Sequence, residues 1–137
     1  MSQERDEKLR EILTRTSTIA VLGAHAERQR AAFYVPDYLY EQGYRVLPVN
    51  PHLVGTTLWG QPVRATLAEL GERVDMIDVF RRADHLPAHL DDMIAARPDV
   101  VWMQLGVRHE GVAAQLRAAG IDVVQDRCTL ADHRRLM

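Results

Sequence analysis

Five short runs of apolar residues recur along the chain, and each is preceded or followed by a segment with helical spacing. Nearly continuous apolar strands that alternate with helices are typical of a parallel sheet covered on both faces. The pattern predicts an α/β fold: a single three-layer Rossmann-like domain, with a five-stranded parallel sheet and helices on both faces. Right-handed crossovers favour the strand order 3-2-1-4-5. The predicted strands are Thr18–Leu22, Arg45–Val49, Met76–Phe80, Val100–Leu105 and Ile121–Val124.

The segments between these runs carry helix signals of their own. Pro36 sets the expected start of the second helix near Tyr34 or Val35, because proline is tolerated only in the first turn. We expect residues 1–16 to form an N-terminal helix packed on the domain, and residues 1–137 to be one domain. The predicted helices are Gln3–Thr16, a helix within 32–42, a short capped helix from Thr66 to Gly71, a helix from Pro87 to Ala96, Glu110–Ala119 and Thr129–Leu136.

The composition excludes several other classes of protein. Apolar residues make up 47% of the chain and charged residues 26%, which are ordinary values for a folded globular protein. A net charge of −2 provides no basic surface for nucleic acid, and no apolar run is long enough to span a membrane. The first residues are too charged for an export signal, and the single cysteine, Cys128, cannot form an internal disulfide. We therefore expect a cytoplasmic protein.

The first apolar run ends at Gly23, and a loop of small and basic residues leads from it to a helix. Such a glycine is typical of a site where a helix N-terminus faces an anion, and also of a tight turn that needs its backbone freedom. Ligands of doubly wound sheets bind outside the carboxyl ends of the strands, at a switch point expected here between the first and fourth strands. The residues at these ends are the Gly23 loop, Asn50-Pro51, Phe80-Arg81, Gln104–Arg108 and Asp126–Cys128.

The NAD fingerprint G-x-G-x-x-G is incomplete after this strand. His25 and Arg28 stand where its later glycines would be, and Asn50 ends the second strand in place of the carboxylate that holds ribose. A neutral strand end beside Arg28 and Arg30 would tolerate a phosphorylated ribose, as in NADP or coenzyme A. A solvated loop before the helix is the alternative explanation of the two arginines.

Five segments at these strand ends resemble, in order, those of the small bacterial CoA-binding proteins that consist of one Rossmann domain. This family is related to the CoA-binding domain of the succinyl-CoA synthetase α subunit, and the resemblance spans Ile19–Arg135. Residues 55–63 also resemble the synthetase loop that follows the second strand. The five segments are Ala20–Ala24, Tyr44–Pro51, Asp78–Arg82, Trp102–Arg108 and Asp126–Cys128.

The resemblance implies a binding protein for coenzyme A or acyl-CoA, as a monomer or homodimer. By similarity, the backbone N–H groups of Gly23, Ala24 and His25 would approach the pyrophosphate, and Asn50, Pro51 and His52 would border the adenosine and its phosphate. Phe80 and Arg81 would lie against the pantetheine or nucleotide, and Gln104 and Gly106 would line the far side. The family usually has a small hydroxyl residue and a proline after Gly-Ala, whereas this chain has His25-Ala26-Glu27. Because a carboxylate beside a pyrophosphate is unfavourable, either Glu27 points away or the affinity for the ligand is reduced.

No segment corresponds to the phosphohistidine or ATP-binding domains of the synthetases, so we expect no catalytic residues. Three alternatives stay open: an NAD(P)-dependent or other nucleotide-binding enzyme, a subunit that keeps the fold without the ligand, and a thiol redox or CoA-linked switch at Cys128. Arg127 and the following helix would favour a reactive thiolate, but a small buried cysteine fits the pattern too. His85, His89 and Asp92 have metal-ligand spacing, yet surface histidines explain them better and no metal site is predicted.

Overall fold

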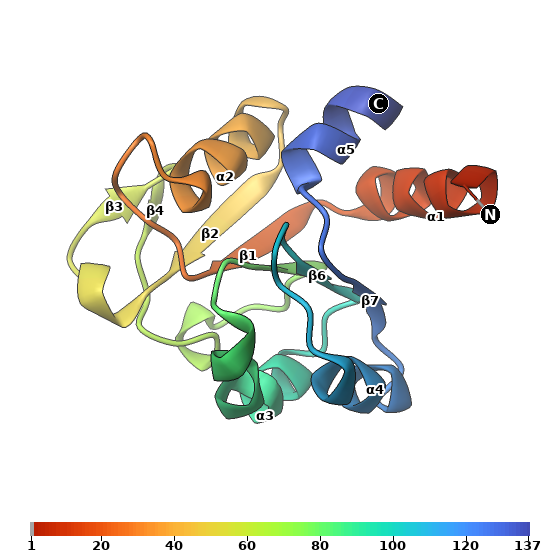
Figure 1. The fold of residues 1–137 in the computed structure, drawn as a ribbon. Helices are drawn as coiled ribbons and strands as arrows, with labels where there is room; N and C mark the ends of the chain where they lie inside the picture. The colour runs from red at the N-terminus through yellow and green to blue at the C-terminus, as the bar shows by residue number, and fades with distance from the viewer. Residues whose placement is uncertain (1) are drawn as a thin grey trace.

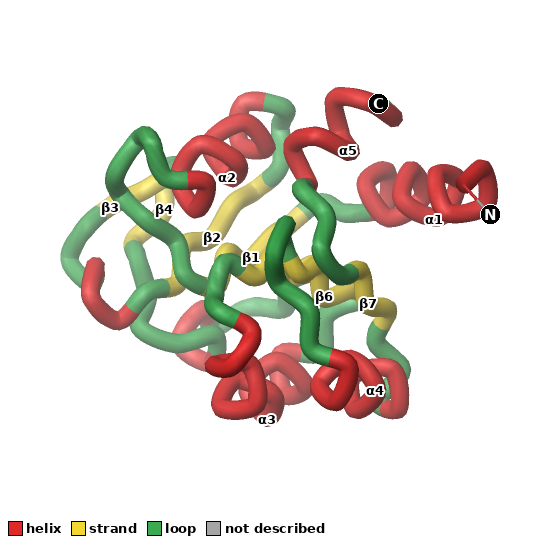
Figure 2. Tube along the Cα trace, in the orientation of Figure 1, coloured by secondary structure: helices red, strands yellow, loops and turns green. Residues whose placement is uncertain are grey.

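A five-stranded parallel sheet runs through the middle of the protein, between two layers of helices (Figures 1 and 2). The computed structural model describes residues 2–137 and confirms the predicted α/β Rossmann-like fold. The sheet strands are β1 (Thr18–Leu22), β2 (Arg45–Val49), β5 (Met76–Val79), β6 (Val100–Met103) and β7 (Asp122–Val124). A separate hairpin pairs β3 (Thr57–Leu58) with β4 (Gln61–Pro62).

The strand order is β2-β1-β5-β6-β7, so the predicted order 3-2-1-4-5 is wrong. The third long strand, β5, pairs with β1 and not with β2. The space beside β2 is taken by the segment after β4, because Val49 forms a parallel bridge with Arg64. The N–H of Arg64 donates to the carbonyl oxygen of Pro48 at 3.1 Å, and the N–H of Asn50 donates to the carbonyl oxygen of Arg64 at 2.9 Å. The switch point therefore lies between β1 and β5.

Helices cover both faces of the sheet. One face carries α1 (Ser2–Arg15), α2 (Ala31–Glu41) and α5 (Thr129–Leu136), and the other carries α3 (Leu86–Ala96) and α4 (Glu110–Ala118) (Figure 1). Strand β1 shows the alternation that this arrangement requires, since Ile19 and Val21 pack in the first layer and Ala20 and Leu22 in the second. Three short 3₁₀ turns complete the fold: η1 (Pro51–Leu53), η2 (Ala68–Leu70) and η3 (Ala83–His85). No helix in residues 2–137 has the length and apolar character needed to cross a membrane.

The predicted start of the second helix is wrong, because α2 begins at Ala31 and places Pro36 in its second turn. Proline has no N–H to donate to the carbonyl oxygen four residues earlier, which belongs to Ala32. That carbonyl oxygen accepts a hydrogen bond of 3.2 Å from the N–H of His25 instead. The loop after β1 thus satisfies the group that the proline leaves unpaired.

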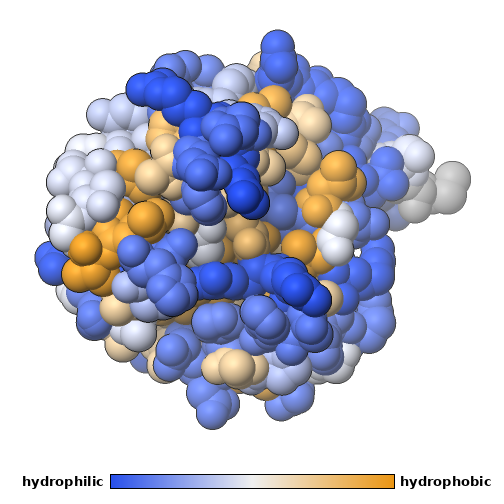
Figure 3. All heavy atoms as spheres, turned by 60° about the vertical axis from the view of Figure 1, so that its left-hand side comes forward, coloured by the Kyte–Doolittle hydropathy of each residue, from blue (hydrophilic) through white to orange (hydrophobic). Residues whose placement is uncertain are grey.

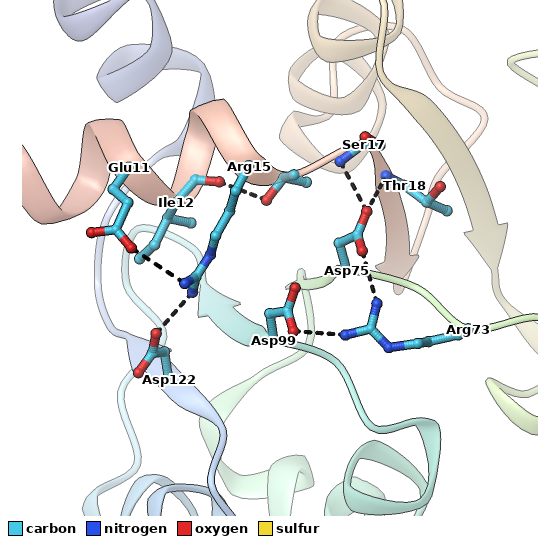
Figure 4. Close-up of polar contacts among 10 residues, drawn as sticks. Glu11, Ile12, Arg15, Ser17, Thr18, Arg73, Asp75, Asp99 and Asp122 are labelled. Atoms are coloured by element: carbon cyan, nitrogen blue, oxygen red, sulfur yellow. Dashed lines mark hydrogen bonds and ion pairs between the residues drawn. The ribbon is translucent and has the colours of Figure 1, made fainter.

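Charged side chains tie the elements together at the amino ends of the strands, on the side opposite the expected site (Figure 4). Arg15 at the end of α1 contacts Asp122 of β7 at 2.8 Å. Arg73 contacts Asp75 at 2.9 Å and Asp99 at 2.6 Å, while Asp75 also accepts the N–H groups of Ser17 and Thr18. The α1 helix buries Leu9, Ile12 and Leu13 as its amphipathic pattern predicts.

Candidate functional site

Two cavities lie at the carboxyl ends of the strands, and Arg81 lines both. The first, which we call the α2–α5 cavity, has a volume of about 310 Å³. The second, the α3 cavity, has a volume of about 200 Å³. The α2–α5 cavity is lined by Ala31, Tyr34, Val35, Phe80, Arg81, Arg82, Gln104, Leu105, Gly106, Val107 and Cys128. The α3 cavity is lined by Leu22, Val49, Pro51, Ala65, Thr66, Leu67, Arg81, His89 and Asp92.

A larger hollow of about 700 Å³ lies between η2 and the C-terminal end of α3, and no residue of the predicted site lines it. It reaches Val74 and Arg97, which precede β5 and β6, and so extends toward the amino ends of the strands. On the side of the molecule turned forward in Figure 3 the surface is mostly hydrophilic, with apolar patches at the left, to the right of the centre and, between hydrophilic side chains, near the middle. Because ligands of such sheets bind at the carboxyl ends, the two smaller cavities are the candidate site.

Gly23 stands at the end of β1 where no side chain fits. Its φ of +93° lies in the region that favours glycine, and an added Cβ would lie 3.0 Å from the carbonyl oxygen of Phe80. The same Cβ would lie 3.3 Å from Cδ of Arg81. The glycine therefore lets the ends of β1 and β5 meet and gives the Arg81 side chain its path.

The structure corrects the expectation that the N–H groups of Gly23, Ala24 and His25 hold a pyrophosphate. Gly23 and Ala24 both donate to the carbonyl oxygen of Val49, at 2.9 and 3.2 Å, and His25 donates to Ala32. These three donors are already used inside the protein. The N–H groups of Ala31 and Ala32, at the start of α2, find no acceptor among residues 2–137. Since Ala31 lines the α2–α5 cavity, the positive end of this helix is the available anion donor.

Arg81 has no partner for its charge in the part of the chain that the structure describes. It forms no ion pair there, and its Nε atom is buried without a hydrogen-bond acceptor. Its charge acts on His89 across the α3 cavity: desolvation, and then Arg81, lower the pKa of that histidine. A guanidinium group with free donors suits a phosphate, which accepts two parallel N–H bonds. Arg81 is therefore the strongest candidate for contact with an anionic ligand.

The two loop arginines lie outside both cavities. Arg30 is exposed and its Nε contacts Glu27 Oε2 at 3.1 Å, whereas the guanidinium of Arg28 lies 5.5 Å from the centre of the Phe33 ring. Nδ1 of His25 accepts the N–H of Glu27 at 3.0 Å. Glu27 and Arg30 are thus held within their own loop, and Arg28 lies against Phe33.

Asn50 has a structural role that the sequence does not reveal. The residue is 8% exposed, and its side chain donates from Nδ2 to the carbonyl oxygen of Ala24 at 2.8 Å and accepts the N–H of His52 at 2.9 Å. The bond from Nδ2 joins the ends of β1 and β2, and the bond to the amide oxygen caps the η1 turn. Pro51 lines the α3 cavity, while His52 is exposed and lines neither cavity.

Phe80, Arg81, Gln104 and Gly106 are the predicted residues that the structure brings together in the α2–α5 cavity. Gly106 has a φ of +86°, and its N–H donates to Asp126 Oδ1 at 2.6 Å. Gln104 is 5% exposed and bonds to Asp78 and Thr129 behind the cavity wall.

Sequence reasoning missed Ala31, Tyr34 and Val35 as lining residues, because Pro36 moved the expected helix start from Ala31 to Tyr34 or Val35. It also treated His89 as a surface residue, although this histidine is partly buried and lines the α3 cavity. The spacing of His89 and Asp92 on one face of the helix, weighed in the sequence only for a metal site, is the signal that brings the two residues together in this cavity. Residues 2–137 hold no group of three or more His, Cys, Asp or Glu side chains that could bind a metal ion.

A parallel sheet with this switch point and ligand-sized hollows at its carboxyl end defines the chain as a Rossmann-like α/β domain. Residues 17–134 match the model of the family described as CoA binding domain, and the chain belongs to that family. It is similar to the solved structure of cell-free ID.343 from Thermus thermophilus, with 51% identity and a TM-score of 0.94 over 96% of this chain and 98% of that one. The uncharacterized protein YneT of Bacillus subtilis is 29% identical over 126 residues, 92% of each chain.

A more distant likeness concerns the fold alone. The structure of RSP in complex with beta-NADH has a TM-score of 0.59 and 14% identity, over 90% of this chain and 60% of that one. The membership of the family confirms the resemblance that the strand-end segments indicate.

Proposed function

We propose that this protein binds coenzyme A or an acyl-CoA at the carboxyl ends of β1, β5 and β6, and acts as a binding protein without chemistry of its own. The observation that carries the proposal is the unpaired Arg81 between two cavities. A buried guanidinium Nε without an acceptor costs free energy, and a ligand phosphate would remove that cost.

The shape of the site suits a long ligand with a charged middle. Coenzyme A has a nucleotide at one end, a pantetheine arm at the other and a pyrophosphate between them. Arg81 and the N-terminus of α2 would hold the pyrophosphate, with one end of the ligand in each cavity. Tyr34, Val35 and Val107 offer apolar contacts to the pantetheine arm in the α2–α5 cavity. The nucleotide would enter the α3 cavity, which Pro51 borders.

Titration calorimetry with a panel of ligands tests the proposal. We expect coenzyme A to bind, dephospho-coenzyme A to bind more weakly for want of one phosphate, and NADH and NADPH to bind more weakly than either. Absence of heat with coenzyme A would overturn the proposal. Tighter binding of NADH or NADPH would favour the nucleotide-dependent enzyme instead.

A second candidate function, a CoA-linked thiol switch, has one observation in its favour. Cys128 is the N-cap residue of α5, is partly exposed and lines the α2–α5 cavity. Its thiolate would attack the disulfide of oxidised coenzyme A, forming a protein–CoA disulfide and releasing one free CoA thiol. Mass spectrometry after incubation with oxidised coenzyme A decides this, and an unmodified Cys128 removes the candidate. The cytoplasmic location and the monomeric or dimeric state stay predictions.

A further inference from the structure

A buried carboxyl group lies directly behind the wall of the α2–α5 cavity. Asp78 is a central residue of β5, paired in register with Val21 of β1 and Trp102 of β6, and its side chain has no exposed surface. A carboxyl group in the interior of a sheet costs free energy unless hydrogen bonds satisfy it. Its partners are Gln104, which follows β6 and lines the cavity, and Thr129, the first residue of α5.

The hydrogen bonds among these three side chains use every donor hydrogen they carry. Gln104 Nε2 lies 2.7 Å from Asp78 Oδ1 and 2.7 Å from Thr129 Oγ1, so both hydrogens of the amide are used. The Thr129 hydroxyl donates to Asp78 Oδ2 at 3.0 Å. The cluster is therefore balanced with Asp78 ionised, since each carboxylate oxygen accepts one hydrogen.

The carbonyl oxygen of the Gln104 side chain, Oε1, is the atom of this cluster that faces away from it. It has no donor among residues 2–137, and it is not one of the fully buried atoms without a partner. Because Gln104 lines the α2–α5 cavity, Oε1 is the polar group that it can offer to a ligand there. With Asp78 ionised, that group is a hydrogen-bond acceptor.

A proton on Asp78 would add a donor, and two atoms of the cluster have a lone pair to accept it. Thr129 Oγ1 can accept it only if the hydrogen bond that Thr129 donates to Asp78 is lost. Gln104 Oε1 can accept it with that bond in place, when the amide rotates by half a turn about its last bond and Oε1 turns toward Asp78. The same rotation carries the NH₂ group toward the cavity.

We propose that protonation of Asp78 switches the group that Gln104 presents to the ligand cavity, from a hydrogen-bond acceptor when Asp78 is ionised to a donor when it is neutral. Asp78 is a positioning residue that acts through Gln104. The identity of the ligand rests on the function proposed above. Pantetheine has amide N–H groups that need an acceptor and amide carbonyl oxygens that need a donor. The switch proposed here places one of the N–H groups against Gln104, so coenzyme A binds more tightly when Asp78 is ionised.

Asp78 changes its protonation at a pH near neutral, so such a switch would respond to pH in that range. Burial raises the pKa of Asp78 to about 7, against the opposing effect of the hydrogen bonds from Gln104 and Thr129. Other titratable or charged side chains are also partly or fully buried on this face of the sheet. None of them bonds to the cluster of Asp78, Gln104 and Thr129 in residues 2–137. Tyr38 bonds to His133 at 2.7 Å, and Arg127 pairs with Asp132 at 2.7 Å. Asp6 of α1 pairs with Arg135 at 2.8 Å, and Asp122 of β7 pairs with Arg15 at 2.8 Å. The remaining ones are His25 after β1, Asp37 of α2, Tyr44 before β2, Arg81 after β5 and Cys128 before α5.

Nuclear magnetic resonance of the ligand-free protein tests the switch without assuming any ligand. The ¹³C shift of the Asp78 carboxyl group and the ¹H and ¹⁵N shifts of the Gln104 side-chain amide are followed from pH 5 to pH 9. We expect both to titrate with one midpoint, and the Gln104 change to be absent in Asp78→Asn. In Thr129→Val the ionised carboxylate loses a donor, so both midpoints move up together. Gln104 signals that stay constant while Asp78 titrates, or an Asp78 that does not titrate in this range, would overturn the proposal.

Calorimetry then measures the effect on binding. Dephospho-coenzyme A is the probe, because it lacks the terminal phosphate that itself titrates near pH 6. We expect its affinity to rise roughly two- to tenfold from pH 6 to pH 8, the value of one net hydrogen bond, and to stay constant in Asp78→Asn. An affinity that does not change with pH in the unmodified protein contradicts the switch. Absence of any binding contradicts the proposed function, and the resonance experiment still decides the switch by itself.

Discussion

The side-chain amide of Asn50 donates a 2.8 Å hydrogen bond to the carbonyl oxygen of Ala24, and this contact joins the ends of two neighbouring parallel strands. The other half of the amide accepts the N–H of His52. Asparagine is required here because the position needs one donor and one acceptor, and an aspartate would offer two acceptors. The residue that sets this chain apart from NAD-binding sequences is therefore also a structural contact.

The variant Asn50→Asp tests this role. We expect it to lower the free energy of unfolding by about 1 to 3 kcal/mol, because the Ala24 carbonyl oxygen loses its donor and meets a carboxylate. Urea unfolding followed by circular dichroism measures the change. Gln115→Glu, the same chemical exchange on the exposed face of α4, is the matched control and should change stability little. Equal effects of the two substitutions would contradict the role of Asn50.

Gly23 and Gly120 provide a second comparison, since both have positive φ but different surroundings. An added Cβ at Gly23 meets the Phe80 carbonyl oxygen at 3.0 Å, whereas one at Gly120 meets nothing within 4 Å. We expect Gly120→Ala to cost about 1 kcal/mol of stability through backbone strain alone, and Gly23→Ala to cost about 2 kcal/mol or more. Gly23→Ala should also weaken binding of coenzyme A, because Arg81 must move. Thermal unfolding and calorimetry give both values, and a Gly23→Ala variant no less stable than Gly120→Ala would refute the close approach.

Arg81 should contribute to binding and not to folding. In Arg81→Met the apolar stem beside Gly23 stays, while the charge and the unpaired Nε are removed. We expect affinity for coenzyme A to fall roughly 10- to 100-fold, the value of a charge-assisted hydrogen bond to phosphate, with stability unchanged or slightly higher. Arg117→Met, an exposed arginine of α4, should leave affinity unchanged. A loss of stability without a loss of affinity would show that Arg81 is a structural residue.

Local sequence patterns predicted the strands and most of the helices. They did not predict the strand order or the start of α2, which depend on contacts between distant segments. The predicted apolar runs lie within a residue or two of β1, β2, β5, β6 and β7, because a parallel strand that is covered on both faces is mostly apolar. The strand order depended on the bridge from Val49 to Arg64, which no periodicity reveals. The start of α2 depended on the bond from His25 to Ala32.

The candidate site, too, was predicted in part from local patterns and depends in part on contacts between distant segments. The strand ends were predicted, and Arg81, Gln104 and Gly106 do line one cavity. What their neighbours do could not be foreseen, since Asn50 and the N–H groups after β1 face inward and satisfy protein groups. Hydrogen-bond partners of this kind are set by the packing of separate elements, so the residue type at a strand end does not determine them.

Protonation of the Asp75 carboxylate makes the stability of the fold depend on pH in the acid range. Partial burial raises the pKa of Asp75, but the N–H groups of Thr18 and Ser17 and the Arg73 guanidinium outweigh it and hold that pKa below its ordinary value of 3.8. The carboxylate therefore stabilises the fold above about pH 4, and this contribution is lost as the pH falls through the lowered pKa. We expect Asp75→Asn to be less stable than the unmodified protein by about 1 kcal/mol or more at pH 7, and the gap to narrow below pH 4. Urea unfolding at a series of pH values measures this, with Asp91→Asn on the exposed side of α3 as control. A gap that is the same at pH 3 and pH 7 would contradict the assignment.

Asp78, three residues further along, should have the opposite dependence on pH. Its pKa in the folded protein is raised to about 7 by burial, from an ordinary value of 3.8, so between these values the folded state holds a proton that the unfolded chain releases. The stability that this proton confers is fully present below about pH 4 and is lost as the pH rises through 7. Asp78→Asn cannot ionise, and its amide can donate as the neutral acid does. We therefore expect the stability of the unmodified protein, measured relative to Asp78→Asn by urea unfolding, to decline steadily from pH 5 to pH 8. Asp91→Asn should show no such trend, and parallel pH profiles for the unmodified protein and Asp78→Asn would mean that the carboxyl group does not change its protonation in this range.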